Sequence, residues 1–163
     1  MTEENFRPLD SLQVMAYIIE RSQALNININ VTKLQKLMYC CYGVLLAEAD
    51  IRLSEESPEA WQYGPVFPKP LKLLKKLTIN EFVSVVGARS VVVSLPQNAK
   101  EAIDKTLRFF GRYTANQLSM WSHLEGSPWS RASNKGKDLY GQIDDQSIRA
   151  YFSTHVIGSI QTA

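Results

Sequence analysis

Apolar residues recur at helical spacing along much of the chain. One such stretch covers about residues 10–25, and Asp10 stands where it can cap the helix N-terminus. A second covers about residues 32–49, where Thr32 is followed three residues later by Gln35, as in a capping box. The apolar residues of this second stretch share one helical face: Leu34, Leu37, Met38, Cys41 and Leu45. The pattern therefore predicts two amphipathic helices at the start of the chain.

Similar spacing predicts shorter helices in the rest of the chain. They cover about residues 69–77, 97–113 and 114–125, with further helices starting at Pro128 and after Asp144. Thr114 and Gln117 form a second capping-box pattern. Ser127 is a suitable cap, and Pro128 after it suits the first position of a helix. These signals predict a chain that is helical over most of its length.

Two segments break the helical pattern. Residues 51–68 combine helix-breaking proline and glycine with bulky apolar residues, which predicts a structured, partly extended segment. Residues 82–86 and 89–95 are rich in β-branched side chains and are separated by Gly87 and Ala88, which predicts a small hairpin. We therefore expect a mainly α fold: a compact bundle of about six helices with one small β-hairpin or extended insertion.

Composition indicates an ordinary folded protein. No linker or repeat divides the 163 residues, so we expect a single domain over residues 1–163. The net charge of +2 is too small to require a nucleic-acid or membrane partner. The adjacent Cys40 and Cys41 point about 100° apart on a helix, which favours two reduced thiols. The N-terminus does not resemble a signal peptide, and the most apolar run, residues 37–47, is shorter than a membrane span, so we expect a cytoplasmic protein.

No catalytic motif stands out in the sequence. The two histidines, His123 and His155, lie far apart, and together with Cys40 and Cys41 they do not have the spacing of a zinc site. Cys41 falls on the apolar face of a helix, where a free cysteine usually packs as a small hydrophobic residue. The acidic residues beside Trp61 fit a solvated loop better than a carboxylate pair in a hydrolase. We therefore expect no enzyme, no metal and no cofactor.

Basic residues recur at helical spacing in two places. Lys69, Lys72 and Lys76 share one face of the helix over residues 69–77, and Lys105, Arg108 and Arg112 repeat the spacing later. Such stripes can contact phosphates or an acidic protein partner. They are also the ordinary wet side of amphipathic helices, which is the interpretation that we favour. A regulator that binds nucleic acid through the lysines stays open as an alternative.

Three segments resemble one known family. They read KLQKLMY from Lys33, EAWQYGPVFP from Glu59 and LSMWSHLEGSPW from Leu118. Together they resemble the Panacea domain family, the SocA-like and GepA-like phage-associated proteins, over about residues 31–152. The matching motif residues are Leu34, Lys36, Leu37, Tyr39, Ala60, Trp61, Tyr63, Gly64, Pro65, Val66, Pro68, His123, Pro128 and Trp129. The helix over residues 10–25 would then pack on this core.

The resemblance implies an antitoxin that neutralises a cognate toxin, encoded nearby, by direct binding. One similar member acts instead as an adaptor that delivers its toxin to a ClpXP-type protease. We expect the motif residues to hold the fold while other surface residues select the partner. In this interpretation Gly64 and Pro65 form a sharp turn, Trp61 and Tyr63 anchor it on the second helix, and His123 and Trp129 hold the following helices to the same region.

Overall fold

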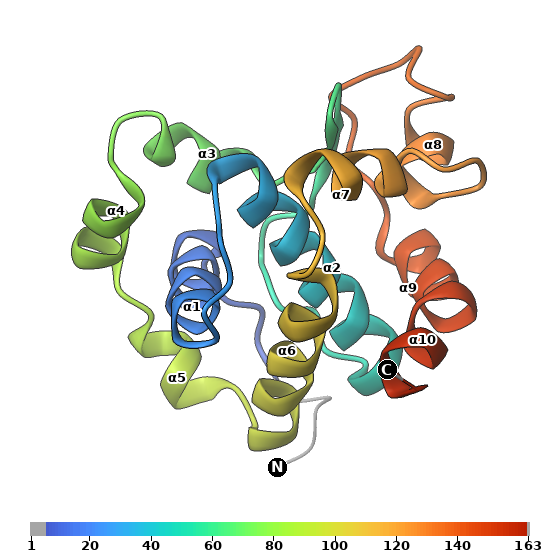
Figure 1. Cartoon of the computed structure of the whole chain (residues 1–163). Helices are drawn as coiled ribbons and strands as arrows, with labels where there is room; N and C mark the ends of the chain where they lie inside the picture. The colour runs from blue at the N-terminus through green and yellow to red at the C-terminus, as the bar shows by residue number, and fades with distance from the viewer. Residues whose placement is uncertain (1–5, 163) are drawn as a thin grey trace.

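The long helix α2 (Val31–Ala49) runs through the middle of the molecule, with other helices around it (Figure 1). In the computed structural model, which describes residues 6–162, every side chain from Lys33 to Leu46 is buried. The sequence predicted one apolar face for this helix, but its surroundings cover all of its faces. Gly43 lets the helix that carries Phe152 cross α2 closely, because a Cβ atom at Gly43 would collide with the ring of Phe152.

The other helices surround α2 and are mostly short. Helices α1 and α6 and helices α7 and α9 contact α2 directly, whereas α4 and α5 pack on α1. Their bounds are α1 (Ser11–Ala24), α3 (Pro68–Leu74), α4 (Ile79–Val86), α5 (Arg89–Ser94), α6 (Gln97–Phe110), α7 (Ala115–Ser122), α8 (Pro128–Ala132), α9 (Asp145–His155) and α10 (Ile157–Thr162). The fold is therefore mainly α, as predicted.

The β structure lies in the segment that was predicted to be partly extended. Strands β1 (Glu59–Trp61) and β2 (Gly64–Val66) pair antiparallel, and Trp61 faces Gly64 across the turn. The hairpin predicted over residues 82–95 is wrong, because those residues form α4 and α5. The sheet consists of these two strands in the part of the chain that the structure describes.

Local capping and packing explain why the valine-rich segment is helical. Thr78 and Glu81 form a complete capping box at the start of α4, a signal that favours helix over strand. Phe82 is fully buried, whereas Val85 and Val93 are exposed. Val91 is buried, but its neighbours Val92 and Val93 are both exposed, which is not the alternating burial of a half-buried strand, and β propensity depends on that packing.

Most predicted helix caps are confirmed. The side chains of Asp10, Thr114, Ser127 and Asp144 each accept a hydrogen bond from a first-turn amide. The capping box predicted at Thr32 is wrong: Asn30 caps α2, and its Oδ1 accepts from the Lys33 amide at 2.8 Å. No helix within residues 6–162 is long and apolar enough to cross a membrane.

Candidate functional site

The three motif segments meet where the β1–β2 hairpin lies against α2, α7 and α8. We call this region the motif junction and define it by Lys36, Gly64, Ser122, His123 and Trp129. Gly64 has a φ of +117°, and a Cβ atom there would lie 2.5 Å from Lys36 Cε and 2.6 Å from Ser122 Oγ. Only glycine adopts that backbone geometry without strain, so it lets the hairpin pack closely on both side chains.

Trp129 connects α8 to the hairpin. Its indole Nε1 donates to the Trp61 carbonyl oxygen at 2.7 Å, and its ring stacks on His123 with centroids 3.8 Å apart. His123 follows directly after α7, so one tryptophan joins α7, α8 and the hairpin. These contacts lie where the sequence analysis expected His123 and Trp129 to hold these elements together, and that role stays a prediction.

Gln35 fixes the other end of the hairpin to α2. Its side-chain oxygen accepts from the Phe67 amide at 2.7 Å, and its nitrogen donates to the Phe67 carbonyl at 3.1 Å. Both bonds are buried, so Gln35 supplies hydrogen-bond partners to the backbone N–H and C=O of Phe67, the residue that directly follows β2. The sequence interpretation assigned Gln35 to a helix cap and missed this role; a polar residue within a buried apolar helix was the available signal.

Burial shapes the electrostatics of the junction. Lys36 is only 1% exposed, and this burial lowers its pKa to about 8, although nearby Cys40 acts in the opposite direction. The pKa of His123 is lowered by burial and by the charge of Lys36. The His123 Nε2 is buried without a hydrogen-bond partner among residues 6–162. The junction therefore holds two nitrogen bases in a poorly solvated setting.

These groups do not make an evident catalytic set. The Ser122 hydroxyl donates to the Ser119 carbonyl oxygen at 2.8 Å, so its proton is engaged by the backbone. Across residues 6–162 no three His, Cys, Asp or Glu side chains group in a way that could hold a metal ion. Cys40 and Cys41 are free and buried, and burial raises the pKa of both thiols. The contacts of the junction support the packing of the hairpin.

The remaining motif residues differ in exposure. Buried ones are Leu34, Leu37, Tyr39, Ala60, Pro65, Val66 and Pro128, and Pro68 is half-buried at the start of α3. Trp61 is half-buried, packs edge-on against Tyr140 and donates from Nε1 to a Glu59 carboxylate oxygen at 2.9 Å. Tyr63 is 67% exposed. The expectation that Tyr63 anchors the turn is therefore wrong, and the deep contact comes from Trp129.

The lysine stripe around α3 is solvent-exposed and partly paired. Lys69 forms an ion pair with Asp10, with 3.0 Å between Nζ and Oδ1. Lys72 is exposed in the last turn of α3, and Lys76 lies beyond the end of that helix. The exposed positions match the wet helix side that the sequence favoured. A role for these lysines in binding stays a prediction.

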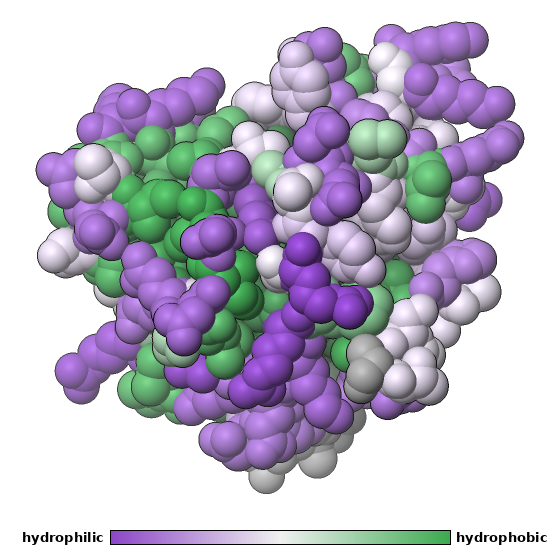
Figure 2. All heavy atoms as spheres, in the orientation of Figure 1, coloured by the Kyte–Doolittle hydropathy of each residue, from purple (hydrophilic) through white to green (hydrophobic). Residues whose placement is uncertain are grey.

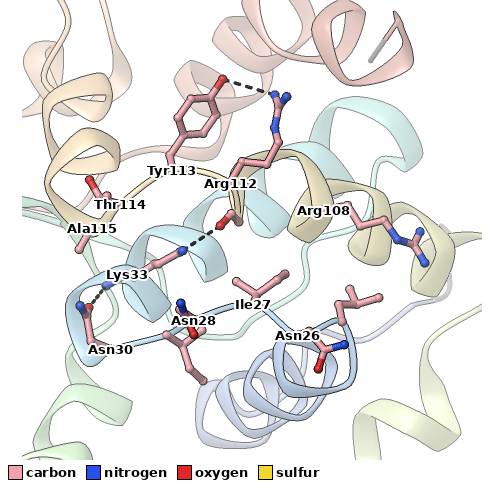
Figure 3. Close-up of a pocket in the computed structure, with 13 residues that line it drawn as sticks. Asn26, Ile27, Asn28, Asn30, Lys33, Arg108, Arg112, Tyr113, Thr114 and Ala115 are labelled. Carbon is pink, nitrogen blue, oxygen red and sulfur yellow. Dashed lines mark hydrogen bonds between the residues drawn. The ribbon is translucent and has the colours of Figure 1, made fainter.

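A second region lies on the face where the α1–α2 loop meets α6 and α7. A groove of about 600 Å³ is lined there by Asn26, Asn28, Asn30, Lys33, Arg108 and Arg112, with Tyr113 at its edge (Figure 3). We call it the basic groove. Lys33 lies at its base, where it is 7% exposed and donates from Nζ to the Gly111 carbonyl at 2.8 Å. Burial lowers the pKa of Lys33.

An aromatic pocket of about 380 Å³ adjoins the basic groove. It is lined mainly by Phe109, Phe110, Tyr113, Leu118, Trp121 and Val156. Tyr113 lines both hollows, so they are neighbours on the same surface. The sequence indicated Arg108 and Arg112 as part of a basic stripe, but it contained no signal that the loop over residues 26–30 lies beside them.

Comparison with known proteins assigns the chain to a family. Residues 34–130 match the family model described as antitoxin SocA-like, Panacea domain. The chain belongs to the SocA-like Panacea family. It is 31% identical over 134 residues to antitoxin SocA of Caulobacter vibrioides (strain NA1000 / CB15N), spanning 77% of this chain and 71% of that protein. No solved structure gives a significant match.

The family match divides this Panacea chain unevenly. The whole motif junction, from Lys36 to Trp129, falls within the matched residues 34–130. The basic groove draws Arg108 and Arg112 from that part, whereas its loop and Lys33 precede it. The aromatic pocket also uses Val156, which lies after it. Family membership is thus carried by the junction more completely than by the groove.

Proposed function

We propose that this Panacea protein is an antitoxin that neutralises a cognate toxin by binding it directly. The observation that carries the proposal is family membership together with 31% identity to a protein named antitoxin SocA over most of both chains. The resemblance in the motifs is specific, because they converge on one structural junction instead of being scattered over the surface.

The placement of reactive groups supports binding over catalysis. The thiols of Cys40 and Cys41 are buried and have raised pKa values, which disfavours the thiolate that a nucleophile needs. The two histidines have different ring partners: His155 packs against Tyr151 on α9, and His123 stacks on Trp129. Partner recognition by a folded surface requires none of these groups.

Co-expression with the products of neighbouring genes tests the proposal. We expect one neighbour to stop growth when expressed alone, and growth to return when this chain is present. The toxic product should also co-purify with the tagged antitoxin. If no neighbouring product is toxic, or if rescue occurs without any complex, neutralisation by direct binding is wrong.

The same experiment separates sequestration from delivery to a protease. Sequestration leaves the amount of toxin unchanged during rescue, because the toxin is held inactive in a complex. A proteolytic adaptor instead lowers the toxin level, and rescue is lost in a host that lacks ClpXP. Immunoblots of the toxin in hosts with and without that protease distinguish the two outcomes, and an adaptor result would replace sequestration as the mechanism.

A further inference from the structure

The basic groove displays positive charge that has no acidic partner in the part of the chain that the structure describes. Arg108 is exposed, and neither it nor Lys33 or Arg112 forms an ion pair with a residue in the described range 6–162. Within residues 6–162, no aspartate or glutamate lines the groove. The Lys33 ammonium donates to the Gly111 carbonyl and its side chain is largely covered, so a negative ligand in the groove would lie against a partly desolvated charge.

Two helix N-termini add to this positive potential. Asn30 caps α2 and Thr114 caps α7, and both cap residues line the groove (Figure 3). The backbone amides at a helix N-terminus carry a partial positive charge that favours anions. The dipoles of both helices therefore act in the same direction as the three cationic side chains.

Arg112 is already held in place at the boundary of the two hollows. Its Nε donates to the Phe109 carbonyl at 2.9 Å, and its guanidinium lies 4.6 Å from the centre of the Phe109 ring. Tyr113, 38% exposed, also contacts that guanidinium through its ring. A side chain that is ordered before binding loses less conformational entropy when it binds a carboxylate.

Apolar surface borders the groove as well. Leu25, Ile27 and Ile29 contribute to its lining, and the aromatic pocket lies on the other side of Tyr113. Figure 2 shows hydrophobic atoms gathered over α1 and α4, with strongly hydrophilic atoms beside them over the front of α6. Charge and apolar area next to each other suit a protein segment, whereas a nucleic-acid site relies mainly on an extended basic surface.

We propose that the basic groove and the aromatic pocket form one docking surface for an acidic segment of the partner protein. Carboxylates of that segment bind Lys33, Arg108 and Arg112, and an aromatic or large aliphatic side chain fills the pocket beside Tyr113. This inference rests on the proposed function, in which the partner is the cognate toxin. The net charge of the whole chain is only +2, so the local concentration of positive charge gives the surface its selectivity for acidic sequences.

Charge reversal in the full chain tests the docking surface. We expect Arg108→Glu with Arg112→Glu to weaken binding of the co-purified toxin by at least about tenfold, and added salt to weaken the wild-type complex. The matched control is Arg131→Glu with Lys137→Glu, which makes the same change in net charge at exposed positions that line neither hollow. The control should bind within about twofold of the wild type.

Folding is checked by a milder variant. Arg112 donates to the Phe109 carbonyl, so its reversal affects local structure, whereas Arg108 is exposed and forms no ion pair among the described residues. Arg108→Glu alone should retain the urea midpoint of the wild type and still weaken the complex. If both reversed variants bind the toxin with wild-type affinity, the docking surface is wrong. Growth rescue by the wild-type chain would still support the antitoxin function.

A peptide probe tests the same surface without the toxin. We would titrate the ¹⁵N-labelled full chain with a synthetic peptide of alternating glutamate and phenylalanine, and with its lysine counterpart. Chemical shifts of Lys33 and of residues 111–115 should move with the acidic peptide only. Shifts confined to other surfaces, or tighter binding of a single-stranded oligonucleotide to the groove, would show that the surface does not recognise acidic protein segments.

Discussion

The motif junction and the arginines of the basic groove place basic side chains in opposite environments. Lys36 is buried against Gly64 at the junction, where burial disfavours its charged form. Arg108 and Arg112 carry their charges at the surface, without acidic partners among residues 6–162. From this difference we propose that the residues that identify the family frame the fold, and that a partner binds another face.

The two regions also differ in what a substitution would change. The junction consists of mutual contacts, such as the Trp129 bond to the Trp61 carbonyl, so a change there affects folding before it affects binding. The groove and the aromatic pocket also contain exposed side chains, such as Arg108 and Tyr113, where substitutions change charge and shape at little cost in stability, whereas Phe110, Leu118 and Val156 belong to the core. Substitutions in the two regions should therefore have different consequences.

The largest effect is expected at Gly64. Gly64→Ala places a Cβ atom at positive φ and against Lys36 and Ser122. Backbone strain and overpacking together should lower the free energy of unfolding by about 4 kcal/mol. Urea unfolding followed by circular dichroism measures this loss.

Gly87 provides the matched control for Gly64. Its φ is also positive, at +70°, but a Cβ atom there has nothing within 4 Å. Gly87→Ala should lower the free energy of unfolding by only about 1–2 kcal/mol, because strain acts without a collision. Equal losses in the two variants would mean that the close contact at the junction contributes nothing.

A pH-dependent effect is expected at Lys36. Its folded pKa of about 8 lies below the ordinary value of 10.5, so between these pH values the unfolded chain binds more protons than the folded chain. The free energy of unfolding therefore gains from this group as pH rises through that interval, by about 3 kcal/mol in all. Below pH 8 the folded protein carries the full cost of the buried ammonium.

Lys36→Met removes this dependence. The variant should be more stable than the wild type at pH 7, and its advantage should shrink as pH rises from 8 towards 10.5, the interval set by the two pKa values. Urea unfolding of both proteins at several pH values measures the difference, in which other titrations cancel. Lys137→Met, at an exposed position, is the control. A difference that stays constant across the interval would refute the low folded pKa.

A smaller loss is expected from Trp129→Phe. The phenyl ring retains a stack on His123 but removes the donor to the Trp61 carbonyl and leaves unfilled volume. We expect the free energy of unfolding to fall by about 2 kcal/mol. Trp61→Phe removes a bond to the carboxylate of Glu59 from a half-buried ring, and should cost less than about 1 kcal/mol. If Trp61→Phe lowers the free energy of unfolding more than Trp129→Phe does, then the Trp129 side chain is not the main contact between α8 and the hairpin.

Local signals predicted the helices well where spacing and caps agreed. Asp10, Thr114 and Asp144 each marked a helix start that the structure confirms. Residues 82–95 misled the prediction because valine favours strands only when packed in a sheet, and Val85 and Val93 are exposed on helices. The true hairpin turns at Gln62 and Tyr63, which are not the asparagine–glycine type that marks two-residue turns.

The sites were harder to predict because they depend on long-range contacts. Gln35 fitted a capping box in sequence, yet its amide binds Phe67, 32 residues away. In the groove Lys33 contacts Gly111, which lies 78 residues away in the sequence, and no local sequence pattern predicts such a contact. The motifs identified the junction, since the resemblance supplied the tertiary information that periodicity lacks. The proposed docking surface could be recognised only from the three-dimensional structure.

Tyr63 should show the smallest effect on folding, and it tests the comparison most directly. It is a motif residue at the tip of the hairpin, yet it is 67% exposed, so Tyr63→Ala should change the free energy of unfolding by less than about 0.5 kcal/mol. Exposed tyrosines can also be hot spots in protein interfaces. If the groove is the docking surface, toxin affinity should stay within about twofold of the wild type. A loss above about tenfold, with the urea midpoint unchanged, would place the partner at the hairpin tip and show that the motif both frames the fold and binds the toxin.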